Sequence, residues 1–512
     1  MEKYNKTHPD GYLQLPICDK TVVTELSGDF TLPDYQPEIK RLLRVGASIL
    51  PPSKYIGDRE AEFAGNIDYY VLYTGSDNEL YCAPLTAEYK VNLPIERVDS
   101  DDSGSVVDPI GDVITVTDMI SGRVTAPRKI SIKCRLRSRA RIFGDMPLEN
   151  GFGEGDDSVR VLTGEMKASR VLQSGAEHLN LSDEMICDNK DGDMRVISAD
   201  GRVMISEVAP ALGSVSCRGD VYLTLLISRE DGSRPYTSRR KLPFSCTVQI
   251  DGVVNGCGVN AKGTVSEMNI TIDEGRIGID LGIIVEAEAC RDESISYIKD
   301  MYSIARQTDN TYKNVSMFAV NMPICGNFTL SDSVALTDAG IPENAKIISV
   351  IGSASADEYS FEGGKCVIGG KAKFSILADR DGEYSVFDLE LPFSYRAPFT
   401  GDFDSASCAA EIVSASARLD GERIGIDAEV SVSGSAMMNR SEKMLASLGF
   451  GDEITRERGE YVICYPMSGD SLWSVAKRYG APTEKLIEAN GIDSDVHLDS
   501  EDSLDGLNYV VI

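Results

Sequence analysis

The side chains most often used for metal binding and nucleophilic catalysis are sparse in this chain. Its three histidines, His8, His178 and His497, lie in three separate segments. Its twelve cysteines are scattered without a single Cys-x-x-Cys pair. Zinc sites usually draw on closely spaced ligands, and a cysteine nucleophile needs a base such as histidine. The sequence therefore indicates neither a metal site nor a catalytic cysteine–histidine pair.

Acidic and glycine-rich segments also fail to match a chemical motif. DSDDSG at 99–104 begins like a calcium loop, but Val107 and Ile110 stand at its ninth and twelfth positions. A solvated acidic loop explains it better. KCVIGGKAK at 365–373 lacks the first glycine and the hydroxyl residue of a phosphate-binding loop, which favours a hairpin turn. We predict no catalytic residues, no metal and no cofactor, and expect that the chain is not an enzyme.

Binding chemistry is more plausible in YVICYPMSGDSLWSVAKRYGAPTEKLIEANGID, residues 461–493. Asp470 or Ser471 can cap a helix over 472–479 whose apolar residues share one face. Thr483 can cap a second helix, and Gly491 can end it in the left-handed conformation. The flanking apolar stretches, YVIC and YVVI, can supply two strands. The segment therefore predicts a small strand–helix–helix–strand module.

Trp473, the only tryptophan, lies one position past Leu472 and so at the edge of the buried helix face. One alternative is a cap on the module's small core. The other is a docking anchor for a protein, because tryptophan is enriched among residues that dominate binding energy.

A second candidate interface is a basic row in KISIKCRLRSRARIF, residues 129–143. Apolar residues alternate there with Lys133, Arg135, Arg137, Arg139 and Arg141. Such a row repels itself unless acidic groups lie against it. Neighbouring strands, loops such as DSDDSG, or solvent can neutralise it. Alternatively, it meets an acidic face on a later part of the chain or on another copy, which would allow self-association.

The elements that position these residues are repeated. RIGID occurs at 276–280 and 423–427, with the looser RKISIK at 128–133. LPF occurs at 242–244 and 391–393, and strands follow Gly65, Gly219 and Gly370 in GNIDYYVLY, GDVYLTLLI and GKAKFSILA. Landmarks in constant order indicate three copies of one unit.

Each copy has the alternation of a half-buried strand, as in IGIDLGIIVEAEA. Helix is expected only over 37–45 and over 440–460, the latter as a helix and linker. The chain is therefore predicted to be mainly β. Three tandem antiparallel β units, sandwiches or open barrels, would precede the small α+β module.

LPDYQPEIKRLLRV (32–45), SCRGDVYLTLLI (216–227) and KLPFS (241–245) resemble the SPOCS domain of bacterial spore-coat proteins. Residues 461–493 resemble the LysM domain. That second resemblance implies a groove for N-acetylglucosamine polymers. By position, its residues would be Gly469, Asp470, Ser471, Leu472, Asn490, Gly491 and Ile492, with Trp473 beside them.

Together the chain resembles the SipL-type spore coat morphogenetic proteins of anaerobic spore formers. This implies a non-enzymatic adaptor of coat assembly whose LysM module docks a coat morphogenetic ATPase on the forespore surface. The alternative is a peptidoglycan-binding protein that uses the module on glycan. The expected division is 1–178, 179–326 and 327–438 for three SPOCS-like units, the second matching best. Residues 439–459 would form the helix and linker, and 460–512 the LysM domain.

Composition limits the partners and the compartment. The formal net charge is −30, which opposes binding to nucleic acid and to anionic membranes. The N-terminal residues lack a secretory signal, and no stretch is apolar enough for membrane insertion. Scattered cysteines fit reduced thiols. We therefore expect a cytoplasmic protein, which the resemblance places in the mother-cell cytosol and at the forespore surface during sporulation.

Overall fold

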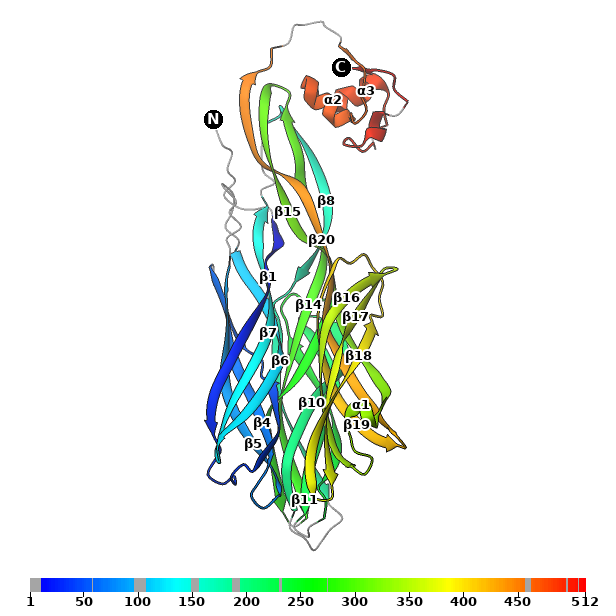
Figure 1. The fold of residues 1–512 in the computed structure, drawn as a ribbon. Helices are drawn as coiled ribbons and strands as arrows, with labels where there is room; N and C mark the ends of the chain where they lie inside the picture. The colour runs from blue at the N-terminus through cyan, green and yellow to red at the C-terminus, as the bar shows by residue number, and fades with distance from the viewer. Residues whose placement is uncertain are drawn as a thin grey trace.

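The computed structural model describes residues 11–57, 59–95, 107–148, 156–186, 194–229, 233–273, 275–455, 462–493, 496–504 and 506–512. Three β units lie side by side in an elongated body, a narrower β stalk continues from it, and a small helical module lies beside the stalk tip (Figure 1). The DSDDSG loop falls outside these residues. Among the helices described, none combines the length and apolar character needed to cross a membrane.

Every unit has the same strand plan. A first strand is followed by a meander of three strands, the first of which is split in two in unit one, and a final hairpin returns to pair with the first strand. Two antiparallel sheets thus face each other as a sandwich. The strands of unit one are β1 (Gly11–Thr31), β2 (Arg41–Ile49), β3 (Ser53–Ile56), β4 (Glu60–Thr74), β5 (Leu80–Pro94), β6 (Val107–Ala126) and β7 (Lys129–Leu148).

Units two and three repeat this plan, which confirms the predicted tandem β units. Unit two contains β9 (Gly175–Ile186), β10 (Met194–Ala211), β11 (Ser214–Arg229), β12 (Tyr236–Gln249), β13 (Gly258–Asp273) and β14 (Arg276–Ser303). Unit three contains β15 (Arg306–Ala335), the short α1 (Leu336–Ala339), β16 (Lys346–Glu362), β17 (Lys365–Arg380), β18 (Glu383–Arg396), β19 (Ser405–Asp420) and β20 (Arg423–Glu453). Boundaries after residues 178, 326 and 438 fall inside β9, β15 and β20, and KCVIGGKAK lies in strand β17 rather than in a turn.

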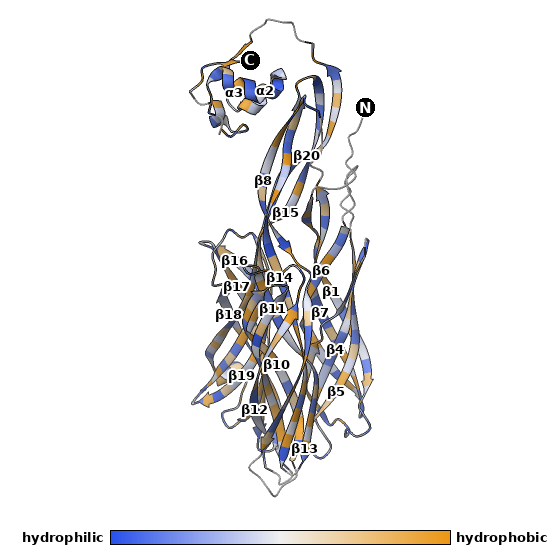
Figure 2. Ribbon diagram, turned by 180° about the vertical axis from the view of Figure 1, so that it is seen from behind, coloured by the Kyte–Doolittle hydropathy of each residue, from blue (hydrophilic) through white to orange (hydrophobic). Residues whose placement is uncertain are grey.

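Alternating burial along the strands gives each unit a core of its own. In β14, Ile277, Ile279, Leu281 and Ile283 are buried while the residues between them are at least partly accessible. The same alternation appears as orange and blue bands along the strands in Figure 2. The period of two in the sequence therefore reports the inner face of each sandwich correctly.

The repeated glycine has a steric function. Gly219 and Gly370 each lie opposite a β-bulge, where a Cβ would overlap the carbonyl oxygen of Met204 or Ser355. The phenylalanine of each LPF motif also packs over its glycine. In unit one the partner strand is interrupted between β2 and β3, and the three atoms nearest to a Cβ at Gly65 all belong to the Tyr89 side chain. Any side chain at Gly219 or Gly370 must therefore displace backbone.

The three units meet along a common axis through a second set of bulges. The bulged residues are Leu43, Ile197 and Ile348, one in the first meander strand of each unit. Each bulge lies opposite the leucine at the same position of the central meander strand, Leu72, Leu226 or Leu377. These six side chains pack in a single cluster between the units. The repeats thus pack with approximate threefold symmetry.

The helix predicted for 37–45 is wrong, because β2 occupies Arg41–Ile49. Leu42 packs into the core of unit one, whereas the bulged Leu43 packs at the axis. Adjacent leucines facing two different cores, together with the buried Ile39, produce spacing that imitates one face of a helix.

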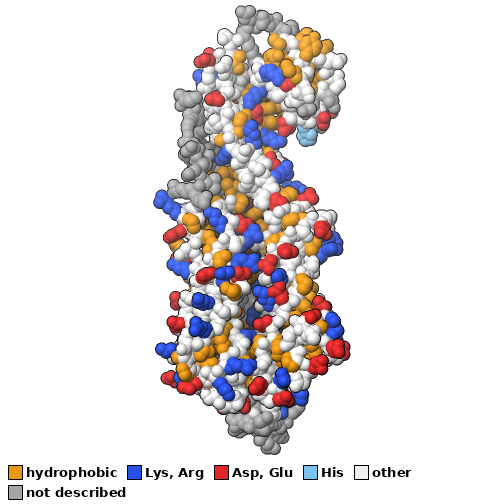
Figure 3. Space-filling model, viewed as in Figure 1, with side chains coloured by type: hydrophobic (Ala, Val, Ile, Leu, Met, Phe, Trp, Pro, Cys, Tyr) orange, Lys and Arg blue, Asp and Glu red, His pale blue; other side chains and the backbone are white. Residues whose placement is uncertain are grey.

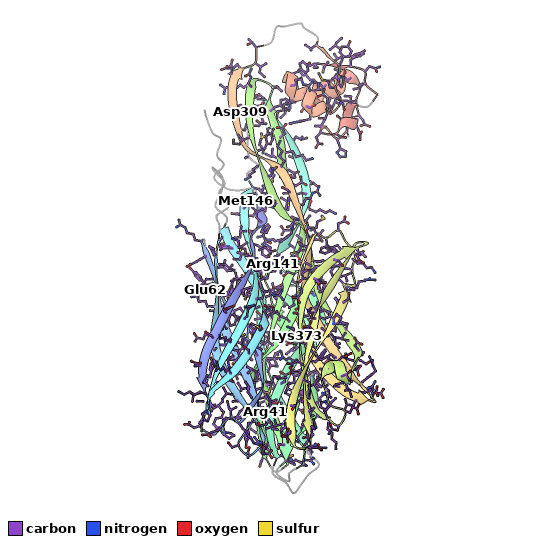
Figure 4. All side chains as sticks on the ribbon, viewed as in Figure 1. Arg41, Glu62, Arg141, Met146, Asp309 and Lys373 are labelled. Atoms are coloured by element: carbon purple, nitrogen blue, oxygen red, sulfur yellow. The ribbon has the colours of Figure 1, made fainter. Side chains whose placement is uncertain are left out.

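Above the body, the final strands of units two and three continue as a stalk. The second half of β14 pairs with β8 (Val159–Val171), while β15 pairs with β20 almost along its full length. Apolar residues of β1, β7, β8, β14, β15 and β20 join at its base, where Figure 4 labels Met146. The stalk is therefore an extension of the repeats rather than a separate linker.

The helix predicted within 439–459 is also wrong, because β20 runs to Glu453 and pairs with β15. A register shift at Thr311/Tyr312 leaves Ala446 as an extra residue on β20. Met444, Leu445 and Leu448 are consequently all buried, with a spacing that a helix would also give.

Replacing Gly219 by alanine is expected to destabilise unit two, because the methyl group must displace the Met204 carbonyl. The expected loss is about 1–3 kcal/mol, typical of overpacking. Gly65→Ala is the matched control and should cost less, because the nearest atom is a Tyr89 ring carbon at 3.0 Å. Thermal and urea unfolding of both variants measure this, and equal losses would contradict the steric explanation.

Candidate functional site

The C-terminal module contains the predicted strand–helix–helix–strand order. Strand β21 (Ile463–Cys464) pairs with β22 (Val510–Val511), and between them lie α2 (Leu472–Tyr479), α3 (Thr483–Asn490) and a short 3-10 helix, η1 (Glu501–Leu504). The module has its own apolar core, which includes the fully buried Leu472 and Val475.

Local capping fixes the two helices. Ser471 caps α2, and its backbone N–H donates to the Ser474 hydroxyl at 2.9 Å, which completes a capping box. Gly480 and Gly491 end α2 and α3 in the left-handed conformation, the latter as predicted. Thr483 is the first residue of α3 rather than its cap, because Pro482 occupies that position.

Most of the candidate groove residues hold the module together. Asp470 accepts from the Met467 N–H and pairs with Arg478. Asn490 donates to the Val511 carbonyl and accepts from the Val511 N–H, both at 2.8 Å, which fastens β22 to α3. Ser471 and Leu472 are buried. In the predicted groove, Gly469 and Gly491 are exposed, and Asn490 and Ile492 are partly accessible.

An apolar surface lies next to that groove. Ile463, Tyr465 and Met467 alternate with the buried Cys464, and Tyr509 directly precedes the paired strand β22. Tyr465 and Met467 are 70 % and 72 % exposed, and the other two are about half exposed. Hydrophobic surface is visible on the module in Figure 3. We call these four residues the sheet face. Four large apolar side chains gathered on so small a module indicate an interaction surface.

Trp473 is not at the open surface. It is 4 % exposed, and its ring packs edge to face with the Tyr302 ring of β14 at a centroid distance of 4.9 Å. Its Nε1 donates to Asp300 Oδ2 at 2.8 Å. The sequence pattern did not identify these stalk partners. A partner protein cannot contact the indole while the module rests on the stalk.

The basic row lies where unit one meets unit three. Arg135 pairs with Glu25 of its own unit, whereas Arg137 pairs with Asp357 of β16. Arg139 binds Asp19 through two hydrogen bonds of 2.8 Å and also donates to the Ala406 carbonyl of β19. Charges of both signs are visible over this part of the body in Figure 3. The row is thus neutralised partly by neighbouring strands and partly by a later unit.

Arg141 reaches furthest into the junction, where Figure 4 labels it. It is 8 % exposed and donates to the Ser435 hydroxyl at 2.8 Å. Because β7, β14 and β20 begin at equivalent residues of the repeat, Arg141, Glu288 and Ser435 occupy one repeat position in three units. The side chain at this repeat position is therefore basic in unit one, acidic in unit two and neutral in unit three. The positive charge of Arg141 also favours ionisation of Glu288.

Partly buried acids and lysines lie where unit one meets unit two. Lys54 pairs with Asp112 at 2.8 Å, and Lys262 pairs with Glu286 at 3.3 Å. Burial opposes ionisation of Asp112. The positive charges of Lys262 and Lys54, together with hydrogen bonds to Glu288 and Lys54, outweigh the effect of burial and hold the pKa of Asp112 well below its usual value. Burial and the neighbouring Asp112 raise the pKa of Glu288 to about 8. Glu288 is therefore largely protonated at neutral pH and can share its proton with Asp112.

Two adjoining cavities at the junction, of about 260 and 500 Å³, have Lys54, Asp112, Glu286 and Glu288 in their shared walls. Among the residues that the structure describes, no three potential metal ligands lie close enough together to hold an ion. None of the cysteines that the structure describes forms a disulfide bond, and burial raises the pKa of Cys134 to about 11. Such thiols act as packing groups rather than nucleophiles.

The double variant Arg137→Glu with Arg139→Glu is expected to loosen units one and three, because a new carboxylate at position 137 would face Asp357. Arg135→Glu is the matched control, since its partner Glu25 lies in the same unit and is exposed. We expect a lower melting temperature and faster proteolysis for the double variant, with little change for the control. Equal behaviour of the wild type and both variants would show that the row does not hold these units together.

Glu288→Gln is expected to change how stability depends on pH. The raised pKa means that folding takes up a proton, so the wild-type protein loses stability as pH rises from about 4.5 to about 8. Glutamine cannot ionise and can still hydrogen-bond to Asp112. The variant should therefore match the wild type near pH 5 and melt at a higher temperature at pH 8. A melting-temperature difference that stays constant across this range would contradict the assignment.

Comparison with known families agrees with both resemblances. A LysM domain model matches residues 468–504, and the SPOCS domain model of SipL matches residues 194–273. No curated protein and no solved structure matches the chain. Neither domain found belongs to an enzymatic family, and both are consistent with a sporulation-related protein. The second β unit therefore carries a SPOCS domain of the SipL type, and the C-terminal module is a LysM domain.

Proposed function

We propose that this protein is a non-enzymatic adaptor of spore-coat assembly, acting in the mother-cell cytosol, whose LysM domain docks a coat morphogenetic ATPase on the forespore surface. The observation that carries the proposal is the exposed sheet face on a LysM domain attached to SPOCS-type repeats. A groove that binds only a neutral sugar has no need of exposed Ile463, Tyr465, Met467 and Tyr509 together. A protein interface is enriched in tyrosine and methionine.

The distribution of charge supports a protein partner. Residues 460–512 contain ten Asp or Glu and only three Lys or Arg. Lys477 and Arg478, two of those three cations, are already paired with Asp300 and Asp470. An acidic module with an apolar face fits a partner surface that is apolar at its centre and basic at its rim. Peptidoglycan offers no such charge pattern.

The test is capture of the purified ATPase by the full-length protein. The double variant Tyr465→Asp with Met467→Asp should weaken binding about 30-fold, equivalent to a hot-spot loss of about 2 kcal/mol. Tyr35→Asp is the matched control, because Tyr35 is 76 % exposed and lies on unit one. Circular dichroism should show all variants folded. Failure of the wild type to capture the ATPase, with sedimentation on insoluble peptidoglycan instead, would favour the glycan-binding alternative.

A further inference from the structure

We propose that the stalk tip is an intramolecular docking site for the LysM domain, with Asp300 of β14 as its anchor, and that this contact sets the direction in which the domain faces. Figure 1 shows the domain beside the tip formed by β8, β14, β15 and β20. The inference does not depend on the identity of the external partner.

Asp300 collects hydrogen bonds from both sides of the contact. Within the stalk, Tyr312 and Asn310 donate to its Oδ1 at 2.6 and 2.8 Å. From the LysM domain, Lys477 Nζ lies 2.6 and 2.7 Å from its two oxygens, and Trp473 donates at 2.8 Å. Burial opposes ionisation of Asp300, but these hydrogen bonds outweigh it and keep its pKa below the usual value. A charged, preorganised acceptor is thus matched to one cation and one indole N–H.

Tyr302, two residues further along β14, supplies the apolar half of the site. It is 1 % exposed, packs with the core of the LysM domain, and donates its hydroxyl to the Ala481 carbonyl at 2.6 Å. Its ring meets the Trp473 ring edge to face at an interplanar angle of 72°. Leu162 and Ile304 of the stalk pack around the same core. Domain and stalk therefore share an apolar cluster around a charged anchor.

A β-bulge in β14 lies at the contact with the LysM domain. The register between β14 and β8 shifts between Ile298 and Asp300, so Lys299 is the extra residue. Lys299 pairs with Asp499 of the LysM domain at 2.8 Å, and the next residue, Asp300, binds Lys477. In a regular strand consecutive side chains point to opposite faces, whereas a bulge can redirect one of them. The bulge thus allows the adjacent residues Lys299 and Asp300 both to face the LysM domain.

The domain can still exist apart from the stalk, because it has its own sheet, the capped helix α2 and an apolar core that comes mostly from its own residues. Contacts of this mixed polar kind are typical of interfaces that open, and covalent attachment raises the effective concentration of the two surfaces. Docking covers Trp473 while Tyr465 and Met467 stay exposed. The domain is therefore held with its sheet face outward.

Trp473 provides the experiment, since it is the only tryptophan in the chain. In the full-length protein, Asp300→Asn removes the negative charge, and this should weaken docking about tenfold or more. The tryptophan emission should then move to longer wavelength and acrylamide should quench it more strongly. Asp309→Asn is the matched control, because Asp309 is an exposed stalk residue that Figure 4 labels away from the contact.

A second variant distinguishes release of the LysM domain from the stalk from misfolding of the protein. Lys477→Met removes the opposite charge from the LysM side, and the combined Asp300→Asn and Lys477→Met protein should lose less than the sum of the two single losses. Unchanged emission and quenching in Asp300→Asn, or strictly additive effects, would overturn the docking site. Quenching of the wild type that falls with increasing protein concentration would also overturn it, because it would place the contact between two copies.

Discussion

The fold depends on one steric constraint, the packing of three sandwiches around a shared axis. An extra residue in the first meander strand of each unit, Leu43, Ile197 or Ile348, meets a leucine of the central strand at that axis. A regular strand would direct such a side chain either into the unit's own core or to solvent on its other face. The bulge adds an apolar contact in a third direction, so one sandwich can bury a core of its own and also join two neighbours.

Three copies that pack face to face cannot keep identical polar surfaces, because equal charges would meet at the axis. Position 141 of unit one shows how this conflict is resolved. The equivalent residues are Arg141, Glu288 and Ser435, and the arginine contacts the serine while its charge acts on the glutamate. Asp357, the bulge residue opposite Gly370, is likewise aimed at Arg137. Such polar contacts add little net stability, but a wrongly paired charge is costly, so they select one arrangement of the units.

Sequence patterns predicted the features that depend on regular spacing. Period-two strands, the repeated RIGID and LPF motifs and the stop of α3 at Gly491 all follow local rules, and the structure contains them. Both helix predictions, at 37–45 and within 440–460, failed at bulges, where an extra residue gives adjacent apolar side chains that imitate a helix face. The partner of Trp473 lies far away in sequence, on β14. A local sequence pattern cannot identify this contact, because the contact forms only where the folded stalk ends beside the LysM domain.

The stalk connects the body of three β units to the LysM domain. Strand β14 begins in the core of unit two and ends at Ser303, so the strand that carries Glu288 at the junction also carries Asp300 at the tip. The LysM domain is thus held by the same hydrogen-bonded ladder that holds the three units together. A flexible linker would let the domain sample every direction, whereas a β ribbon passes on the orientation of the body. A domain that presents a small apolar face gains from this rigidity, because less orientational freedom is lost when a partner binds.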